Sequence, residues 1–167
     1  NLIEEGIDLS IRITADLQPG DIVRQLGQVH LLTLASPAYL SEHGEPRHPE
    51  ALAQHECLVY SMSMNSATWP YRVDGQLQQF PVRGRIRANN GLALTRAAAQ
   101  GMGITLQPDF IAEPYLARGE VLELLPDFAP PPLGIYAVLP SNRYIPHRVS
   151  VLLEHLAASF SCISNPD

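Results

Sequence analysis

A short helix with well-marked ends follows an extended segment in the first quarter of this chain, in the sequence LASPAYLSEHG at 34–44. Ser36 can accept hydrogen bonds from the first helical N–H groups, and Pro37 has the fixed φ that suits a first helical position. Gly44 permits the left-handed conformation that ends a helix. Residues 22–35 before this helix are predicted to be extended, with an interruption at Gly27. A strand that passes directly into a capped helix restricts the chain to folds that mix the two.

The rest of the chain repeats this alternation. Apolar and polar residues alternate over 7–13, which is the period of a strand, and Asp74-Gly75 is typical of a hairpin turn. Further strands are predicted at 57–60, within 68–88, at 104–106, 121–125 and 133–139, and helices at 50–55, 90–100, 109–119 and 146–160. Residues 1–5 are predicted to end a helix, and 161–167 to be frayed. The pattern indicates an α/β fold.

Composition excludes several kinds of function. The net charge is −6, which argues against nucleic-acid binding by this part of the protein, because duplex affinity depends on Lys and Arg. The sequence contains no lysine, so a Schiff-base lysine and a Walker-type phosphate loop are both excluded. No apolar run is long enough to span a bilayer. Cys57 and Cys162 lack a CxxC spacing, and we expect both to be reduced in a cytoplasmic protein.

Six segments, taken in order, resemble the effector-binding domain of LysR-type transcriptional regulators. They are GIDLSIRI (6–13), LASPAYLSEHG (34–44), HPEALAQHECL (48–58), RIRANNGLAL (85–94), GMGITLQPDF (101–110) and PPLGIYAVLPSNRYIPHRV (131–149). The resemblance implies a two-lobed α/β fold like that of type-II periplasmic binding proteins, with two Rossmann-like subdomains joined by two crossover segments. It assigns 1–34 and 135–167 to the first lobe, which would be incomplete, and 35–134 to the second.

The same resemblance carries expectations about function. A small anionic effector would bind in the cleft between the lobes and modulate a DNA-bound oligomer, a dimer or, in the full-length protein, a tetramer. DNA would be contacted only through a winged helix-turn-helix domain absent from this chain, and part of the first lobe would also precede Asn1. From the residues themselves we expect no enzymatic activity, no cofactor, no metal and no membrane partner.

The turn at 89–91 is the first candidate for effector binding. Asn89, Asn90 and Gly91 join a predicted strand to a predicted helix. The unpaired N–H groups at a helix start carry partial positive charge and can bind a carboxylate or phosphate. The alternative is that Asn90 only caps the helix and Gly91 only allows close packing.

Two other strand ends are candidates, because ligands in α/β sheets gather at the carboxyl ends of strands. Arg12 could form a fork to a carboxylate and Thr14 could donate a hydroxyl; the alternatives are a surface ion pair and a turn. Gln107 and Pro108 follow the strand 104–106, whose end the resemblance puts beside the cleft. The alternative for these two is a plain strand exit followed by a helix cap at Asp109.

The remaining polar residues favour no catalytic or metal site. Arg83, Arg85 and Arg87 share one strand face and could attract anions, but a solvated face that protects a sheet edge is favoured. The histidines near Cys57 do not have zinc-site spacing. Trp69 is expected in a lobe core rather than in a binding site.

Two rival functions remain open at this point. A solute-binding protein of a transport system could use the same fold, and so could an enzyme, since fold alone does not determine function. The sequence contains no GxSxG nucleophile motif and no HExxH motif. The glycines of GMG at 101–103 lie between a predicted helix and a predicted strand, which is the wrong order for a dinucleotide-binding motif.

Overall fold

The computed structural model describes residues 6–15, 17, 20, 22–61, 68–140 and 145–164. The chain divides into two compact units, residues 1–29 with 132–167 (unit 1) and residues 30–131 (unit 2). The predicted helix end at 1–5 lies outside the described residues.

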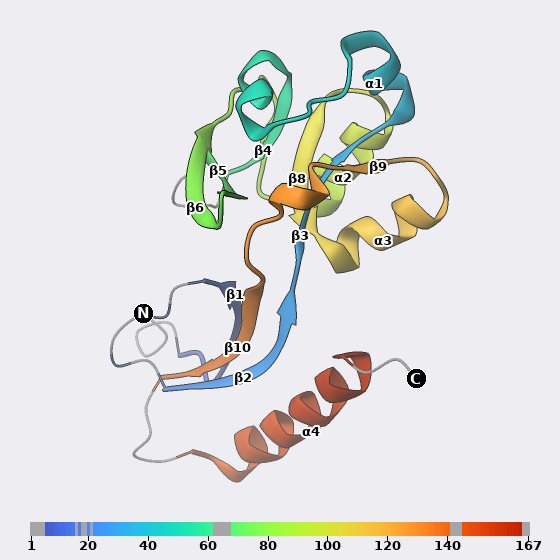
Figure 1. The fold of residues 1–167 in the computed structure, drawn as a ribbon. Coiled ribbons are helices and arrows are strands. Elements are labelled where there is room, and N and C mark those ends of the chain that lie inside the picture. Colours follow the sequence, from blue (N-terminus) through green and yellow to red (C-terminus); the bar gives the residue numbers. More distant parts are fainter. Residues whose placement is uncertain are drawn as a thin grey trace. The chain divides into compact units, whose positions relative to one another are not determined.

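In the described residues, unit 1 is an antiparallel sheet packed against one long helix (Figure 1). Strand order is β1-β10-β2, formed by β1 (Ser10–Thr14), β2 (Ile22–Val29) and β10 (Leu133–Leu139), and the helix is α4 (His147–Ser164). Apolar side chains of β2 and β10 pack on Val149 and Leu153 of α4. Ile11 and Ile13 of β1 remain 45% and 41% exposed, so their face of the strand is not covered by the described residues.

Unit 2 contains a five-stranded mixed sheet in the order β7-β4-β8-β3-β9. Its strands are β3 (Leu31–Ala35), β4 (Cys57–Tyr60), β7 (Arg87–Ala88), β8 (Ile104–Pro108) and β9 (Leu122–Leu124). β4 is parallel to β7 and β8, whereas β3 is antiparallel to β8 and β9. A separate hairpin is formed by β5 (Thr68–Val73) and β6 (Gln76–Pro81), and the helices are α1 (Pro37–His43), α2 (Gly91–Ala99), α3 (Asp109–Ala117) and the 3-10 helices η1 (Pro49–Gln54) and η2 (Pro126–Phe128).

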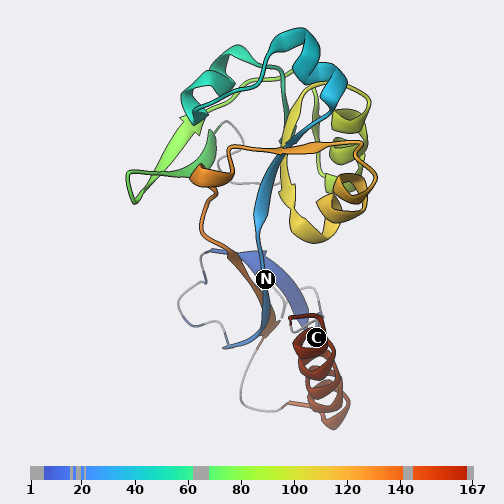
Figure 2. The ribbon, with the colours of Figure 1, turned by 45° about the vertical axis from the view of Figure 1, so that its right-hand side comes forward.

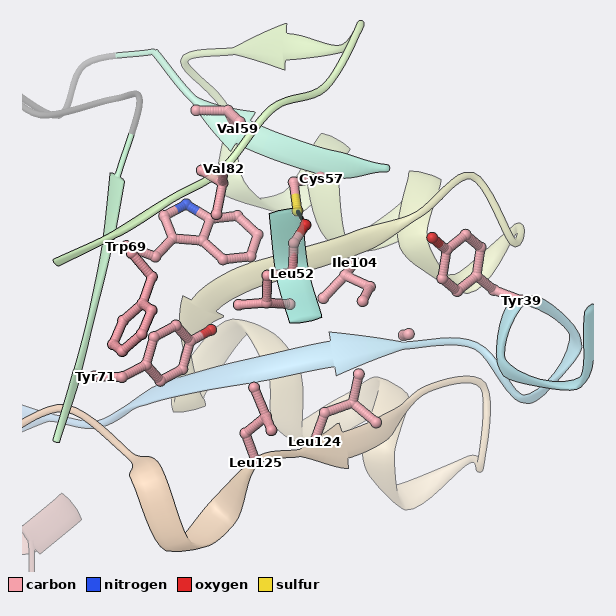
Figure 3. Packing of buried hydrophobic residues seen from close by; sticks show 12 residues of the cluster. Tyr39, Leu52, Cys57, Val59, Trp69, Tyr71, Val82, Ile104, Leu124 and Leu125 are labelled. Atoms are coloured by element: carbon pink, nitrogen blue, oxygen red, sulfur yellow. Dashed lines mark hydrogen bonds between the residues drawn. The ribbon is translucent and has the colours of Figure 1, made fainter. Parts of the chain in front are cut away.

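Both faces of this sheet are covered. Helices α2 and α3 lie on one face, and η1 and the hairpin lie on the other (Figures 1 and 2). Successive residues of a strand point to opposite faces, so Leu58 packs with Leu94 of α2 while its neighbours Cys57 and Val59 face the hairpin. Figure 3 shows the hairpin side, where Trp69 and other aromatic and aliphatic side chains form the larger core.

Local sequence signals were reliable in this unit. The Ser36 hydroxyl accepts the Tyr39 N–H at 3.2 Å, so the predicted cap of α1 is confirmed. The predicted hairpin turn is also confirmed, since Asp74 and Gly75 both have positive φ, 50° and 77°. Trp69 is 6% exposed within the core, as expected. No helix in the described ranges is long and apolar enough to cross a membrane.

Two expectations about boundaries were wrong, and so was the alternative interpretation of Asp109 as a helix cap. Strand β2 continues through Gly27, beside a shift in its pairing with β10, and the extended stretch breaks at His30 instead. The last helix continues to Ser164, so 161–164 are helical rather than frayed. Asp109 is the first helical residue of α3 and not its N-cap; its carboxylate instead accepts the His30 and Phe110 N–H groups at 3.0 and 2.8 Å.

The buried thiol of Cys57 gives a prediction about alkaline stability. Burial raises the pKa of Cys57 to about 12, despite the opposing hydrogen bond from the Arg83 backbone. In the unfolded chain the thiol ionises near pH 8.5, so the folded state binds the proton more tightly. The free energy of unfolding should therefore fall as pH rises above about 8.5, by up to about 1.4 kcal/mol per pH unit from this group.

Urea unfolding of the wild type and of Cys57→Ala at a series of alkaline pH values measures this effect. The comparison uses the two slopes, because the substitution itself removes packing. We expect the wild type to lose stability more steeply with pH than the variant. Equal slopes would show that the thiol does not stay protonated in the folded state.

Candidate functional site

The first turn of α2 has backbone donors without acceptors. Asn90 is the N-cap, in an extended conformation, and its side-chain oxygen accepts the Ala93 N–H at 3.0 Å. The Leu94 N–H is taken by the Asn90 carbonyl at 3.2 Å. The N–H groups of Gly91 and Leu92 have no acceptor in the described part of the chain, and Asn89 and Asn90 are exposed. Such a helix start has a partial positive charge directed at its surroundings.

Gln107 lies beneath this turn on β8 but is not open to solvent. Its side chain is 2% exposed, and its Nε2 donates to the Thr105 hydroxyl at 2.9 Å. The Thr105 hydroxyl in turn donates to the Leu58 carbonyl of β4 at 3.1 Å. We expected Gln107 to face an effector; the structure instead places its amide inside the layer between β8 and α2. Gln107 is therefore packed against the first turn of α2.

Gly91 lies in close contact with the Gln107 amide. A Cβ added at position 91 would lie 2.5 Å from Gln107 Oε1 and 3.0 Å from Ile111 Cδ1. Contacts under about 3 Å require something to move, so a side chain at position 91 would displace either the Gln107 amide or the turn itself. On the helix side, the Thr95 hydroxyl donates to the Gly91 carbonyl at 2.9 Å. Gly91 is therefore fixed both from the sheet and from its own helix.

Pro108 ends β8, is partly buried, and stands at the N-cap position of α3 without a side-chain cap bond. Beside it, the Asp109 N–H donates to the His30 carbonyl at 2.8 Å. Together with the His30 N–H bond to the Asp109 carboxylate, this contact ties the first residue of unit 2 to the start of α3.

Arg12 and Thr14 belong to unit 1. Both lie on β1, partly buried, opposite Tyr136 and Gly134 of β10. The structure thus brings together Asn89, Asn90, Gly91, Gln107 and Pro108 within unit 2, and leaves Arg12 and Thr14 in the other unit. Whether these two side chains contact an effector stays a prediction.

Two buried hydroxyls in this region were not anticipated. Thr95 and Thr105 are both fully buried, and each bonds to a main-chain carbonyl. One feature of the sequence could have indicated the role of Thr105. Thr105 and Gln107 are two polar residues two positions apart on a buried strand, so their side chains lie on the same face of the sheet. Nothing local in the sequence marks Thr95, because a threonine inside a helix usually faces solvent or its own backbone.

The arginines at 83–87 are exposed, as expected for a solvated edge. The Glu56 carboxylate accepts the Arg85 N–H at 2.6 Å and holds this segment against β4. A shallow hollow of about 430 Å³ lies here, and another of about 360 Å³ lies between the ends of α2 and α3, lined by Arg96, Tyr115 and Arg118 among others. Neither hollow includes a residue predicted to bind the effector.

The histidines take part in packing. His43 stacks on the Tyr39 ring at 4.3 Å, and His55 Nδ1 lies 3.0 Å from the Tyr39 hydroxyl. Burial lowers the pKa of His55, and the nearby His43 adds to this effect. Within the described ranges, no three His, Cys, Asp or Glu side chains gather in a group that could hold a metal ion.

The fold is similar to that of solved regulatory domains of transcriptional regulators. The chain superposes on the regulatory domain of CrgA, a LysR-type transcriptional regulator from Neisseria meningitidis, with a TM-score of 0.80 at 28% identity, covering 95% of this chain and 78% of that one. The LysR substrate binding domain family matches residues 1–161, and the chain belongs to that family. The predicted α/β, type-II periplasmic-binding-protein-like fold is thereby confirmed.

Curated relatives agree with this assignment. An uncharacterized HTH-type transcriptional regulator from Haemophilus influenzae is 33% identical, over 90% of this chain and 52% of its own length. The HTH-type transcriptional regulator PtxR from Pseudomonas aeruginosa is also 33% identical, over 93% of this chain and 50% of its own length. The chain thus spans about half the length of these relatives. They are regulators and not transport proteins, so the transport alternative is not supported.

Proposed function

We propose that this chain senses a small anionic effector through the first turn of α2 and so controls a transcriptional regulator. The observation that carries the proposal is the pair of N–H groups at Gly91 and Leu92, which have no acceptor in the described residues and lie at the positive end of a helix. Membership of the LysR substrate binding domain family supports a ligand role for this domain. The cleft between two lobes, at the boundaries predicted from the sequence, stays part of this proposal.

The proposal extends to the protein as a whole. The chain would bind and not convert its ligand, without a cofactor, in the cytoplasm. DNA would be contacted by another domain, and the regulator would act as a dimer or tetramer. Support comes from the relatives, which are HTH-type transcriptional regulators. Binding can only transmit a signal if the effector has different affinities for two states of the oligomer.

One substitution separates anion binding from helix capping. Asn90→Asp keeps a side-chain oxygen for the Ala93 N–H and so preserves the cap. It also adds a negative charge beside the Gly91 and Leu92 amides, which should weaken binding of an anion about tenfold. Calorimetric titration of the chain with a panel of aromatic and aliphatic carboxylates measures the binding constants. The urea midpoint of the variant should equal or exceed that of the wild type.

Gln78→Glu is the matched control, because it changes charge by the same amount at an exposed position of the hairpin. It should leave every binding constant unchanged. The Asn89→Ala variant reports whether the neighbouring exposed amide contributes. If no carboxylate binds the wild type, or if one binds Asn90→Asp as tightly as the wild type, the effector site is not at this turn.

A further inference from the structure

The amide of Gln107 has only one orientation consistent with its surroundings. The Leu58 carbonyl can only accept a hydrogen bond, so the Thr105 hydroxyl donates its single proton to it, at 3.1 Å. Thr105 must therefore accept from Gln107 at 2.9 Å, which requires Nε2 on that side. The opposite atom, Oε1, then points at α2. It accepts no hydrogen bond from the described part of the chain; it is not a fully buried atom, so it keeps slight contact with solvent although the residue is only 2% exposed.

This oxygen lies where the first turn of α2 comes close to the sheet. Oε1 occupies the space that a side chain at position 91 would need, 2.5 Å from where its Cβ would be. The first turn of α2 rests on the amide through the bare Cα of Gly91, and the Thr95 hydroxyl holds the Gly91 carbonyl at 2.9 Å from the other side. A larger side chain at position 91 would move the first turn of α2 away from the sheet. A shorter side chain at position 107 would let the turn move closer to the sheet.

We propose that Gln107 is a positioning residue of the effector site: its amide, anchored by Thr105, fixes the depth of the first turn of α2 and hence the direction of the Gly91 and Leu92 N–H groups, without contacting the effector. This inference rests on the proposed function. The side chains at 107 and 91 are then complementary in size. A larger residue at position 91 should be compensated by a smaller residue at position 107.

Reciprocal rescue tests the pair. Gly91→Ala, Gln107→Ala and the double variant are compared with the wild type in the full 167-residue chain. Sulfate is the probe, because helix starts bind it through backbone N–H groups. Its apparent affinity is read from the NMR shifts of the residue 91 and 92 amides, and stability from the urea midpoint. Gln76→Ala, which shortens an exposed amide on β6, is the control.

Each single variant should weaken sulfate binding about threefold or more, since a small misplacement of binding groups is costly. The double variant should bind more tightly than either single variant. Gly91→Ala should lower the urea midpoint in the wild type but not in the Gln107→Ala background. Gln76→Ala should change neither quantity.

Three outcomes would overturn the inference. A double variant no better than Gln107→Ala would mean that the amide contacts the anion itself. If Gly91→Ala lowered the urea midpoint equally in the wild type and in the Gln107→Ala background, Oε1 would not limit how closely α2 approaches the sheet. If sulfate leaves the wild-type amides unshifted while the midpoints remain coupled, the packing is as described but the proposed effector site is wrong, and the positioning role is lost with it.

Discussion

Gly84→Ala should lower the free energy of unfolding by about 3–5 kcal/mol. A Cβ at this position would lie 1.6 Å from the Cys57 carbonyl oxygen and 2.7 Å from its carbonyl carbon. Both are backbone atoms of β4, which lies inside the sheet between β7 and β8, and the Cys57 N–H is bonded to the Arg83 carbonyl at 3.0 Å. No side chain can rotate to make room, so the strand itself must shift. Urea unfolding, or loss of soluble protein, measures the effect.

Gly119→Ala is the matched control. Gly119 has a φ of +69°, and nothing lies within 4 Å of an added Cβ. The control therefore carries the conformational cost of an L-residue in the left-handed region, about 1–2 kcal/mol, without a steric clash. If Gly84→Ala were no more destabilising than Gly119→Ala, the close approach of residues 83–85 to β4 would be incorrect.

Tyr71→Ala should cost about 3–5 kcal/mol, the range for removing a large aromatic side chain from a core. Tyr71 is fully buried between the hairpin and the sheet (Figure 3). Its ring centroid lies 6.0 Å from that of Phe80, with the two ring planes at 69°. Its hydroxyl lies 2.7 Å from that of Thr33 on β3. The substitution leaves a cavity and also leaves the Thr33 hydroxyl without this partner. Thermal or urea unfolding gives the loss of stability.

Tyr60→Ala provides the comparison, since Tyr60 ends β4 and is 39% exposed. A substitution at such a position should change stability by about 0.5 kcal/mol. Tyr71→Phe separates the two contributions of Tyr71, because it keeps the ring and loses only the bond to Thr33, worth about 1–2 kcal/mol. Equal losses for Tyr71→Ala and Tyr60→Ala would contradict the packing of the hairpin on the sheet.

Elements with local causes were predictable from the sequence. The cap at Ser36, the turn at Asp74-Gly75 and the start of α2 at Asn90 each depend on residues within a few positions. Long-range contacts were not predictable. Asp109 looked like a helix cap, but its carboxylate accepts the His30 N–H at 3.0 Å, from a residue between β2 and β3 that is 79 positions away in the sequence.

The candidate site follows the same division. The turn at 89–91 was found because an Asn-Asn-Gly sequence between a strand that ends at Ala88 and a helix that begins at Gly91 is recognisable. Gln107 was predicted at the correct strand end, but it was expected to face an effector, whereas its amide packs against Thr105 and Gly91. Its burial depends on Thr105, on the Leu58 carbonyl of another strand and on Gly91 of a helix. Of these three only Thr105 is close in sequence, so the amide could not be assigned to the interior from the sequence alone.

NMR shift mapping of the labelled chain with the same carboxylate panel tests the central claim most directly. We expect at least one carboxylate to shift the Gly91 and Leu92 amides in a saturable manner, and its neutral amide analogue to leave them unchanged. Saturable shifts confined to residues far from the start of α2, or the same shifts with the neutral analogue, would contradict the account.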